Sequence, residues 1–333
     1  MTMFRRLAWF ATGLALIVIV AGAWVRLTDA GLGCPDWPGC YGMVTWPKTP
    51  EHIETATSAF TEFSASRAVD SGKAFREMAH RYIATLLGFL ILVMAVMAWR
   101  NRSDPAQPVA LASALLALVI FQGILGMWTV TLLLKPAIVT AHLAGGMATF
   151  SLLFWLSLKV TSKGSAAPSL PARAEHRWIW LGFAVVVVQI LLGGWVSTNY
   201  AALACPDFPT CTGSWWPRTD FSEGFRLWRG VGVDYEGGVL DQPARVAIHL
   251  AHRLWALVVI GVLGWLFARL VRVEDLRRPA AVMLVVLAVQ VALGIYNVVG
   301  ALPLPNAVAH NGVAALLLAS LIFLLHRSRR PIA

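Results

Sequence analysis

Four of the eight histidines stand in recurring motifs whose chemistry suits metal ligation. His80 and His252 each lie in the triplet Ala-His-Arg, and His142 and His310 each follow an alanine near the start of an apolar stretch. Neutral imidazole is a ligand for iron, copper and zinc. Any one of these histidines also fits a hydrogen-bonded packing role, but ionisable side chains are costly in apolar helices and usually mark function. The motifs predict two sites, His80 with His142 and His252 with His310.

The number of ligands at each site favours haem over a bare metal ion. A zinc site uses three or four protein ligands, whereas haem brings four nitrogens and requires only axial ligands from the protein. Two histidines per site therefore predict two haems. Gly145, Gly146 and Gly312 closely follow these histidines and would let a flat macrocycle approach the backbone. Small residues in such helices serve packing equally well.

Arg81 and Arg253 directly follow the first histidine of each site. A guanidinium binds carboxylates bidentately, so both arginines are candidates for contacts with haem propionates. Ordinary snorkelling of a long cationic side chain toward the membrane surface explains the same placement.

Glu77 distinguishes the first site from the second. It precedes His80 by three residues, about 4.5 Å along a helix at ~1.5 Å per residue, and on the same face. In the corresponding motif of the second half, HLAHR, His249 takes its place. A carboxylate beside a dry pocket could accept a proton or stabilise positive charge during oxidation. The alternative is a solvated glutamate at a helix start, favoured by the helix dipole. The remaining histidines, His52, His176 and His326, are interpreted as solvated.

The four cysteines form two matching loops, Cys34 with Cys40 and Cys205 with Cys211, each within a CPD(W/F)PxC sequence. We expect both loops on the oxidising outer side, where disulfides are permitted. Prolines within each loop favour turns that would bring its cysteines together, although spacing alone does not establish the geometry. The pairs fit structural disulfides, and the first also fits a redox relay beside the first haem.

Composition places the chain in a membrane. Of its 333 residues, 58% are hydrophobic and 13% charged, and the mean hydropathy is +0.68, far more apolar than soluble domains. About 20 helical residues cross the hydrocarbon layer, and continuous apolar runs indicate helices rather than a barrel. Eight such runs occur, near residues 7–25, 82–99, 109–134, 137–158, 178–198, 246–268, 280–301 and 307–325.

Basic residues predict the orientation of these spans. The net charge of +10 does not indicate nucleic acid, because most of the basic residues collect on one side, which the positive-inside rule makes cytoplasmic. These residues are Arg5, Arg6, Arg100, Arg102, Lys159, Lys163, Arg173, Arg177, Arg269, Arg272, Arg277, Arg278, Arg327, Arg329 and Arg330. Both termini would then be cytoplasmic, and the histidines would lie near the extracytoplasmic surface. Insertions at about 44–75 and 214–242, also extracytoplasmic, would cap the haem sites or dock a partner.

The two halves repeat each other. GAWVRLTDAGLGCPDWPGCYG from Gly22 matches GGWVSTNYAALACPDFPTCTG from Gly193, and three further segments match in the same order. We expect an all-α membrane protein with two tandem four-helix bundles, related by a pseudo-twofold axis along the membrane normal. The first bundle would comprise residues 1–160 with the site of His80 and His142, residues 161–177 would form a cytoplasmic linker, and residues 178–333 would form the second bundle with the site of His252 and His310.

These motifs together resemble the bacterial haem A synthase family over essentially the whole chain. The resemblance rests on EMAHR, AHLAGG, AHR and AHNG in the even spans and on the CPDWPGC loop. It implies oxidation of the C8 methyl group of haem O to a formyl group, giving haem A for terminal oxidases. It further implies a haem B cofactor on His252 and His310, substrate haem on His80 and His142, and an essential glutamate at Glu77.

The resemblance implies a multi-pass protein of the bacterial cell membrane, in contact with lipid. Haem O synthase and oxidase assembly factors are its expected protein partners. Two other functions fit the same residues. A dihaem electron-transfer cytochrome would use the same histidines, and Glu77 argues against it. A membrane thiol-oxidising relay would use the cysteine loops and leave the histidines to pack.

Overall fold

The computed structural model describes residues 2–105, 107–162 and 168–329, and over these residues the chain is helical without a strand. The eight predicted spans are confirmed as helices long and apolar enough to cross a membrane. They are α1 (Thr2–Leu27), α4 (Ser71–Arg100), α5 (Val109–Thr131), α6 (Pro136–Thr161), α8 (His176–Thr198), α10 (Gln242–Leu270), α11 (Glu274–Val299) and α12 (Leu304–Ser328). Four short helices lie outside the spans: α2 (Pro50–Ala59), α3 (Thr61–Ser66), α7 (Leu170–Ala174) and α9 (Phe221–Gly224).

Two of the helices begin well before their apolar runs, because aspartates cap them. The carboxylate of Asp70 accepts hydrogen bonds from the amides of Gly72 and Lys73 at the start of α4. Asp241 does the same for the amide of Ala244 in α10. Such caps satisfy amides that have no partner within the helix. Glu77 and His249 lie about two turns into these two helices, three residues before His80 and His252.

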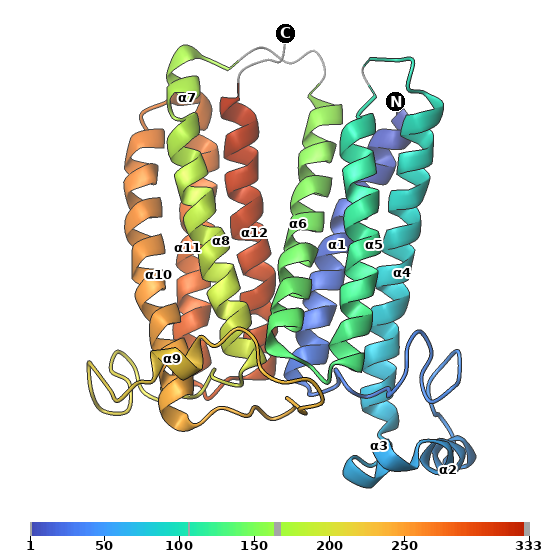
Figure 1. The fold of residues 1–333 in the computed structure, drawn as a ribbon. Coiled ribbons are helices and arrows are strands. Elements are labelled where there is room, and N and C mark those ends of the chain that lie inside the picture. Colours follow the sequence, from blue (N-terminus) through green and yellow to red (C-terminus); the bar gives the residue numbers. More distant parts are fainter. Residues whose placement is uncertain (1, 106, 163–167, 330–333) are drawn as a thin grey trace.

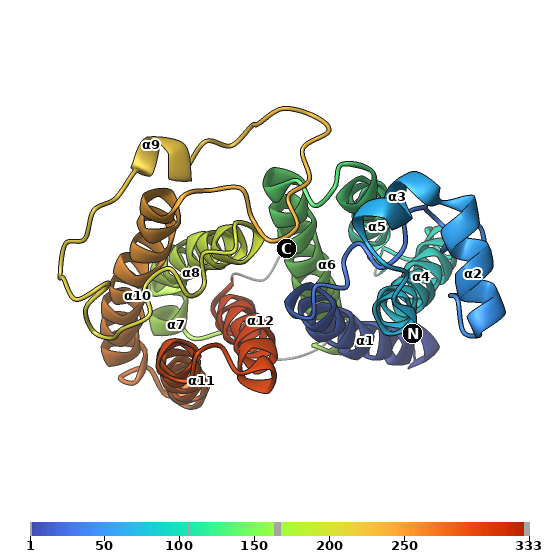
Figure 2. The same ribbon diagram turned by 90° about the horizontal axis from the view of Figure 1, so that it is seen from below.

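Helix contacts divide the spans into two groups of four (Figures 1 and 2). In the first half α1 and α5 each pack on both α4 and α6, and in the second half α8 and α11 each pack on both α10 and α12. Helices α4 and α6 therefore face each other across the first bundle, as α10 and α12 do across the second. Contacts of α12 with α1 and α6, and of α6 with α8, join the two groups. The pseudo-twofold axis stays a prediction.

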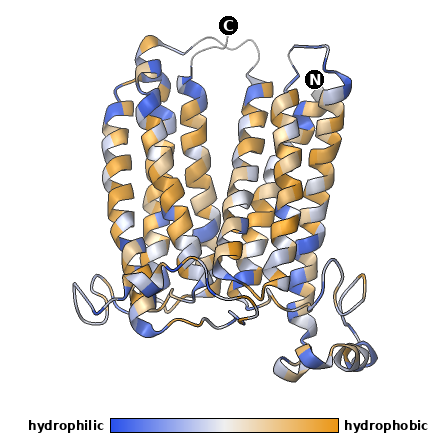
Figure 3. Ribbon diagram, viewed as in Figure 1, coloured by the Kyte–Doolittle hydropathy of each residue, from blue (hydrophilic) through white to orange (hydrophobic). Residues whose placement is uncertain are grey.

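The N-terminal end of α1 and the C-terminal end of α12 lie on the same side of the molecule, and the long loops lie on the opposite side (Figure 1). Hydrophilic residues concentrate at both ends of the helices, with an apolar band between them (Figure 3). The basic residues of the predicted cytoplasmic side include Lys163 and Arg330, which lie outside the described residues, as do residues 163–167 of the predicted linker.

One large apolar core spans both bundles. It comprises buried residues such as Leu153 of α6, Ile179 of α8 and Leu321 of α12. All three come from the half of the bundles that is farther from the long loops. The four motif histidines lie in the opposite half, between this core and the long loops. The core thus holds the helices together at one end, and the histidine sites are built at the other.

The two insertions fold differently. Residues 44–75 form α2, α3 and the start of α4, and cover the first disulfide loop with Phe60, Phe63 and Trp46. Residues 226–238, which we call the crossing segment, leave α9 and extend to the first bundle before returning to α10 (Figure 2). There Tyr235, only 1% exposed, packs with Leu32, Val130 and Leu134 of the first half.

Candidate functional site

Each histidine pair spans the centre of one bundle. His80 is on α4 and His142 on α6, whereas His252 is on α10 and His310 on α12, so each pair joins helices that face each other across the bundle. The imidazoles of each pair are close enough to interact electrostatically. In the described part of the chain, no three His, Cys, Asp or Glu side chains gather as a metal cluster.

A glycine of the preceding helix lies against every one of these imidazoles. A Cβ atom on the glycine would lie 3.1 Å from Cε1 of the histidine in three pairs: Gly22 with His80, Gly193 with His252, and Gly294 with His310. In the fourth pair, Gly126 with His142, this distance would be 3.5 Å. Ordinary carbon contacts are ~3.5–4.0 Å, so a larger residue at three of these positions would displace the ring. We missed these glycines in the sequence, although they recur at matching places of the repeat.

The glycines that follow the histidines have other surroundings. A Cβ atom on Gly312 would lie 3.2 Å from Val20 of α1, at the contact between the bundles, which favours a packing role. Gly145 borders the side chain of Gln122, and Gly146 has no atom within 4 Å of the Cβ position.

Glutamines stand one turn before three of the imidazole-facing glycines. Gln189 Nε2 lies 3.2 Å from both ring nitrogens of His252, and Gln290 Nε2 lies 3.3 Å from His310 Nε2. The third, Gln122, borders Gly145 on the helix of His142. The sequence signal for them was the recurring spacing Gln-x-x-x-Gly in three matching helices.

Several buried polar atoms at these sites have no hydrogen-bond partner. In the first site they are Nδ1 of His80 and His142 and Nε2 of Gln122; in the second they are Nδ1 of His310 and Oε1 of Gln189 and Gln290. Buried polar atoms without partners are rare in folded proteins, and each calls for an explanation. Their concentration around both histidine pairs marks places built for a further group.

Glu77 is 5% exposed and connects the first disulfide loop to α4. Its Oε2 accepts a hydrogen bond from the amide of Cys34 at 2.9 Å, and its Oε1 pairs with Arg81 at 2.5 Å. Burial and the Glu77 carboxylate raise the pKa of the nearby Tyr41 to about 12. The reading of Glu77 as a solvated helix-start residue is therefore wrong. Its carboxylate is buried, one turn from His80 along α4.

Arg81 and Arg253 both bind the carbonyl groups of the adjacent disulfide loop. Arg81 Nη1 donates to Gly39 O at 2.5 Å, and it also reaches the carbonyls of Asp36 and Pro38. Arg253 donates to Thr210 O and Cys205 O, both at 2.8 Å. Neither guanidinium simply extends toward solvent, and contacts of either one with propionates stay a prediction.

In the second half, His249 makes contacts that correspond to those of Glu77 in the first half. Its Nδ1 lies 2.9 Å from Ala201 O, and its Nε2 accepts from Arg253 Nε at 3.1 Å. Both residues therefore connect a loop to the helix and touch the arginine one turn later. The first half has a carboxylate at this place, and the second has an imidazole.

Both cysteine pairs form disulfides, Cys34 with Cys40 and Cys205 with Cys211. All four cysteines are buried. An aspartate organises the turn after each pair: Asp36 accepts from the amides of Tyr41 and Gly42, and Asp207 from those of Thr212 and Gly213. Hydrogen bonds from Thr210 and these amides hold the pKa of Asp207 below its usual value.

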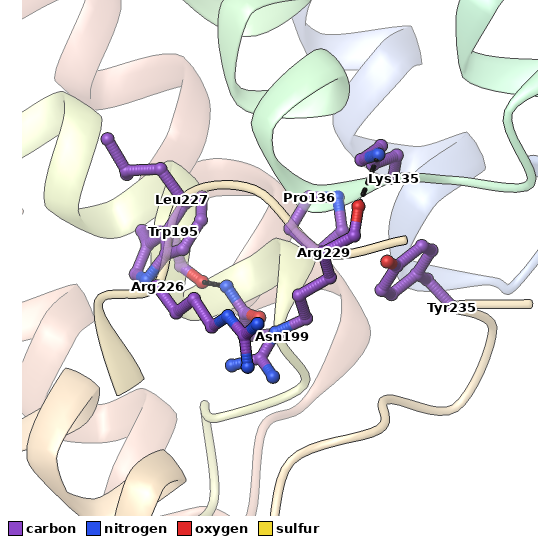
Figure 4. A pocket seen from close by; sticks show the side chains of 8 residues that line it. All are labelled: Lys135, Pro136, Trp195, Asn199, Arg226, Leu227, Arg229 and Tyr235. Carbon is purple, nitrogen blue, oxygen red and sulfur yellow. Dashed lines mark hydrogen bonds between the residues drawn. The ribbon is translucent and has the colours of Figure 1, made fainter. Parts of the chain in front are cut away.

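A separate shallow pocket lies where the crossing segment meets α6 (Figure 4). Lys135, 2% exposed, donates from Nζ to Arg229 O at 2.7 Å and lies over the ring of Trp228. Two ion pairs of Arg67, with Asp234 and Glu236, hold the same segment. The pocket is lined by none of the motif histidines, so we assign it to the joint between the halves.

His326 is buried rather than solvated as expected. Its Nε2 lies 2.8 Å from Ser162 Oγ, and its ring meets Trp155 edge-on. His176 bonds Ser328 through Nδ1, and only His52 is plainly exposed. The apolar run of the last span ends at residue 325, so the sequence did not indicate that α12 continues to Ser328 and includes His326.

Comparisons with known proteins show which proteins the chain is similar to. Residues 5–322 match the family model described as cytochrome oxidase assembly protein. The chain is 41% identical over 317 residues to the haem A synthase of Shewanella oneidensis, covering 94% of each protein. It is also 30% identical over 341 residues to the haem A synthase of a Caulobacter species, covering 96% of this chain and 94% of that one.

Proposed function

This chain belongs to the haem A synthase family and shares its function, and we propose that its two histidine pairs hold two haems with different roles. His252 and His310 would be the axial ligands of a resident haem B, and His80 and His142 would bind haem O, the substrate. The reaction is the oxidation of the C8 methyl group of haem O to a formyl group, giving haem A.

The observation that carries this proposal is the arrangement at the centre of each bundle. Two imidazoles come from helices that lie opposite each other in the bundle, glycines lie against the rings, and buried polar atoms beside them have no partner. These features suit a flat group held by axial histidines. Haem would supply redox chemistry at its iron, while the protein fixes the ligands, excludes water and sets the local charge.

Glu77 is our candidate for the catalytic group of the first site. A buried carboxylate in a dry pocket stabilises developing positive charge better than water does, because it is already oriented. Its contacts with Arg81 and the Cys34 amide hold it in place before any substrate binds. His249 cannot supply a negative charge at the second site, which supports the division into substrate and cofactor sites.

The disulfides support a structural role better than a redox relay. The two loops have the same turn, the same buried disulfide and an arginine anchor each, although only one of the two sites would perform chemistry. The loop of Cys34 differs by its hydrogen bond to Glu77, so it would position the catalytic carboxylate.

We further propose the bacterial cell membrane as location, with both termini cytoplasmic and both haem sites toward the outside. The basic residues at the ends of α1, α4, α6, α10 and α12 support this orientation. Haem O synthase and oxidase assembly factors are the proposed protein partners.

Extraction and chromatography of the bound haems test the function. Protein purified from cells that make haem O should contain haem B together with haem O or haem A, and protein from cells without haem O should contain haem B alone. Haem B alone under both conditions would favour an electron-transfer cytochrome. Purified protein without haem absorption would favour a thiol relay.

A further inference from the structure

An open hollow lies where the second bundle begins, on the side of the molecule opposite the long loops (Figure 1). Helix α7 packs there on both α8 and α12. The hollow is lined by side chains of these three helices: Arg173, Ala174, His176, Arg177, Trp180 and Ser328. None of the motif histidines is among them, so the hollow is separate from both haem sites.

Two arginines give the hollow a positive charge that no described side chain neutralises. Arg177 is exposed, and half-buried Arg173 donates from Nε to Pro168 O at 3.0 Å. Neither forms an ion pair within residues 2–105, 107–162 and 168–329. Glu175, which lies between them in the sequence, accepts two hydrogen bonds from Arg269, at 2.8 and 2.9 Å. A guanidinium without a carboxylate partner suits phosphate, which it binds bidentately.

His176 fixes the wall of the hollow between α8 and α12. Its Nε2 accepts a hydrogen bond from Trp180 Nε1 at 3.2 Å, so Nδ1 carries the proton and donates to Ser328 Oγ at 2.9 Å. The Ser328 hydroxyl in turn donates to Leu325 O at 3.3 Å. Because these bonds form without a ligand, the wall is in place before one binds, which lowers the cost of binding.

Exposed tryptophans mark the level of the membrane surface on this side of the molecule. Four of them, between 40% and 50% exposed, lie near the ends of α1, α4, α8 and α10: Trp9, Trp99, Trp180 and Trp265. Tryptophan is enriched where the hydrocarbon layer meets the headgroups. Trp180 lines the hollow, and Arg177 precedes it by three residues, about 4.5 Å nearer the helix end. The hollow therefore opens at the level of the lipid headgroups.

From these observations we propose that the hollow binds the phosphate group of an anionic phospholipid. Arg173 and Arg177 bind the phosphate oxygens, and Trp180 packs on the glycerol and the first carbons of the acyl chains. Basic pockets between transmembrane helices bind anionic headgroups in this way. A phospholipid is favoured over free phosphate because a soluble ion gains nothing from the exposed indole ring. The inference requires a bilayer and is independent of the proposed haem chemistry.

Native mass spectrometry of the detergent-purified protein, titrated with phosphatidylglycerol, tests the site. Wild-type protein should bind one phosphatidylglycerol more tightly than any further copy, and more tightly than phosphatidylcholine with the same acyl chains. Arg173→Gln or Arg177→Gln should weaken this first binding about fivefold, and the double variant about thirtyfold. The matched control is Arg100→Gln with Arg102→Gln, which removes two exposed positive charges at the end of α4 and just after it. It should leave the first binding unchanged.

Trp180→Ala and inorganic phosphate distinguish a lipid from a soluble anion. Trp180→Ala keeps both arginines and should weaken the binding of phosphatidylglycerol, while phosphate at equal concentration should not displace the lipid from wild-type protein. Displacement by phosphate would show a site for a soluble anion and overturn the inference. Equal lipid binding by the wild type and the double arginine variant, or an equal loss in the control, would also overturn it. If the double variant does not fold, the two single variants make the same comparison.

Discussion

The backbone amide of Cys34 donates a hydrogen bond of 2.9 Å to the carboxylate of Glu77. This bond connects the first residue of a disulfide loop to a helix that also carries His80. Glu77 therefore has two separable properties, its negative charge and its ability to accept the loop's hydrogen bond. A glutamine keeps the second and loses the first.

Glu77→Gln should abolish haem A formation while His252 and His310 keep their haem. Losing one preorganised electrostatic partner typically costs about 10²–10³ in rate, so haem O or a partly oxidised haem should accumulate. Chromatography of extracted haems measures this. Near-normal haem A from the Gln variant would remove the catalytic role. Glu77→Ala also loses the hydrogen bond from the Cys34 amide, so it should additionally weaken the attachment of the first disulfide loop to α4.

His252→Ala or His310→Ala should remove the resident haem, because the remaining histidine then binds on one face only. The absorption spectrum of purified protein is the measurement, with His52→Ala as control because that residue is exposed in a loop helix. A full, unshifted low-spin haem B spectrum in either variant would show that the ligands are assigned wrongly.

Gly22→Ala and Gly193→Ala should each loosen haem at their own site. The new methyl group would meet Cε1 of His80 or His252 at 3.1 Å; moving a side chain off its rotamer costs ~0.5–1.5 kcal/mol, roughly a 2- to 10-fold effect. Gly13→Ala and Gly261→Ala are controls, since nothing lies within 4 Å of their Cβ positions. Haem titration of the stripped protein measures the affinity. Equal effects in all four variants would indicate a general helix effect instead.

Replacing Cys205 and Cys211 by serine should lower stability more than it changes the rate of haem A formation. Closing so short a loop contributes ~2–3 kcal/mol by the chain-entropy argument. Unfolding in mixed detergent micelles gives the stability, and extracted haems give the activity. A double variant of normal stability that lacks only turnover would make this pair a redox element.

Tyr235→Ala should destabilise the joint between the halves. Removing a buried aromatic side chain costs ~3–5 kcal/mol, whereas Tyr235→Phe loses only the hydrogen bond to Gly230 O, ~0.5–1.5 kcal/mol. Limited proteolysis of residues 226–238 in nanodiscs, compared among the three proteins, measures this. Protection that is the same in the Ala variant and the wild type would contradict the packing role.

The spans were predictable, and so was the placement of histidines at equivalent positions of the two halves, because both rest on local signals. Twenty apolar residues in a row have few alternatives to a transmembrane helix, and a repeated Ala-His motif identifies equivalent positions without knowledge of contacts. The sequence also indicated that Glu77 replaces a histidine. The cysteine pairs followed from their place in matching loops.

The partners of these residues were much less predictable. Arg81 binds carbonyls of a loop some forty residues away, and a backbone carbonyl carries no signature in the sequence. The packing of Tyr235 on a distant part of the chain was not predictable either, because no local pattern indicates that contact. The recurring spacing Gln-x-x-x-Gly marks Gln189 in the sequence, but it does not show that the amide lies beside the ring of His252.

The position of Tyr235 also affects the order in which the chain acquires its structure during synthesis. Leu32, Val130 and Leu134 are in place once the first bundle has inserted, but the side chain that covers them follows about a hundred residues later. At ~5–20 residues per second this delay is roughly 5–20 s. Throughout that interval the first bundle exposes an apolar patch on its outer end, and a ribosome that stalls in the linker would leave the patch uncovered.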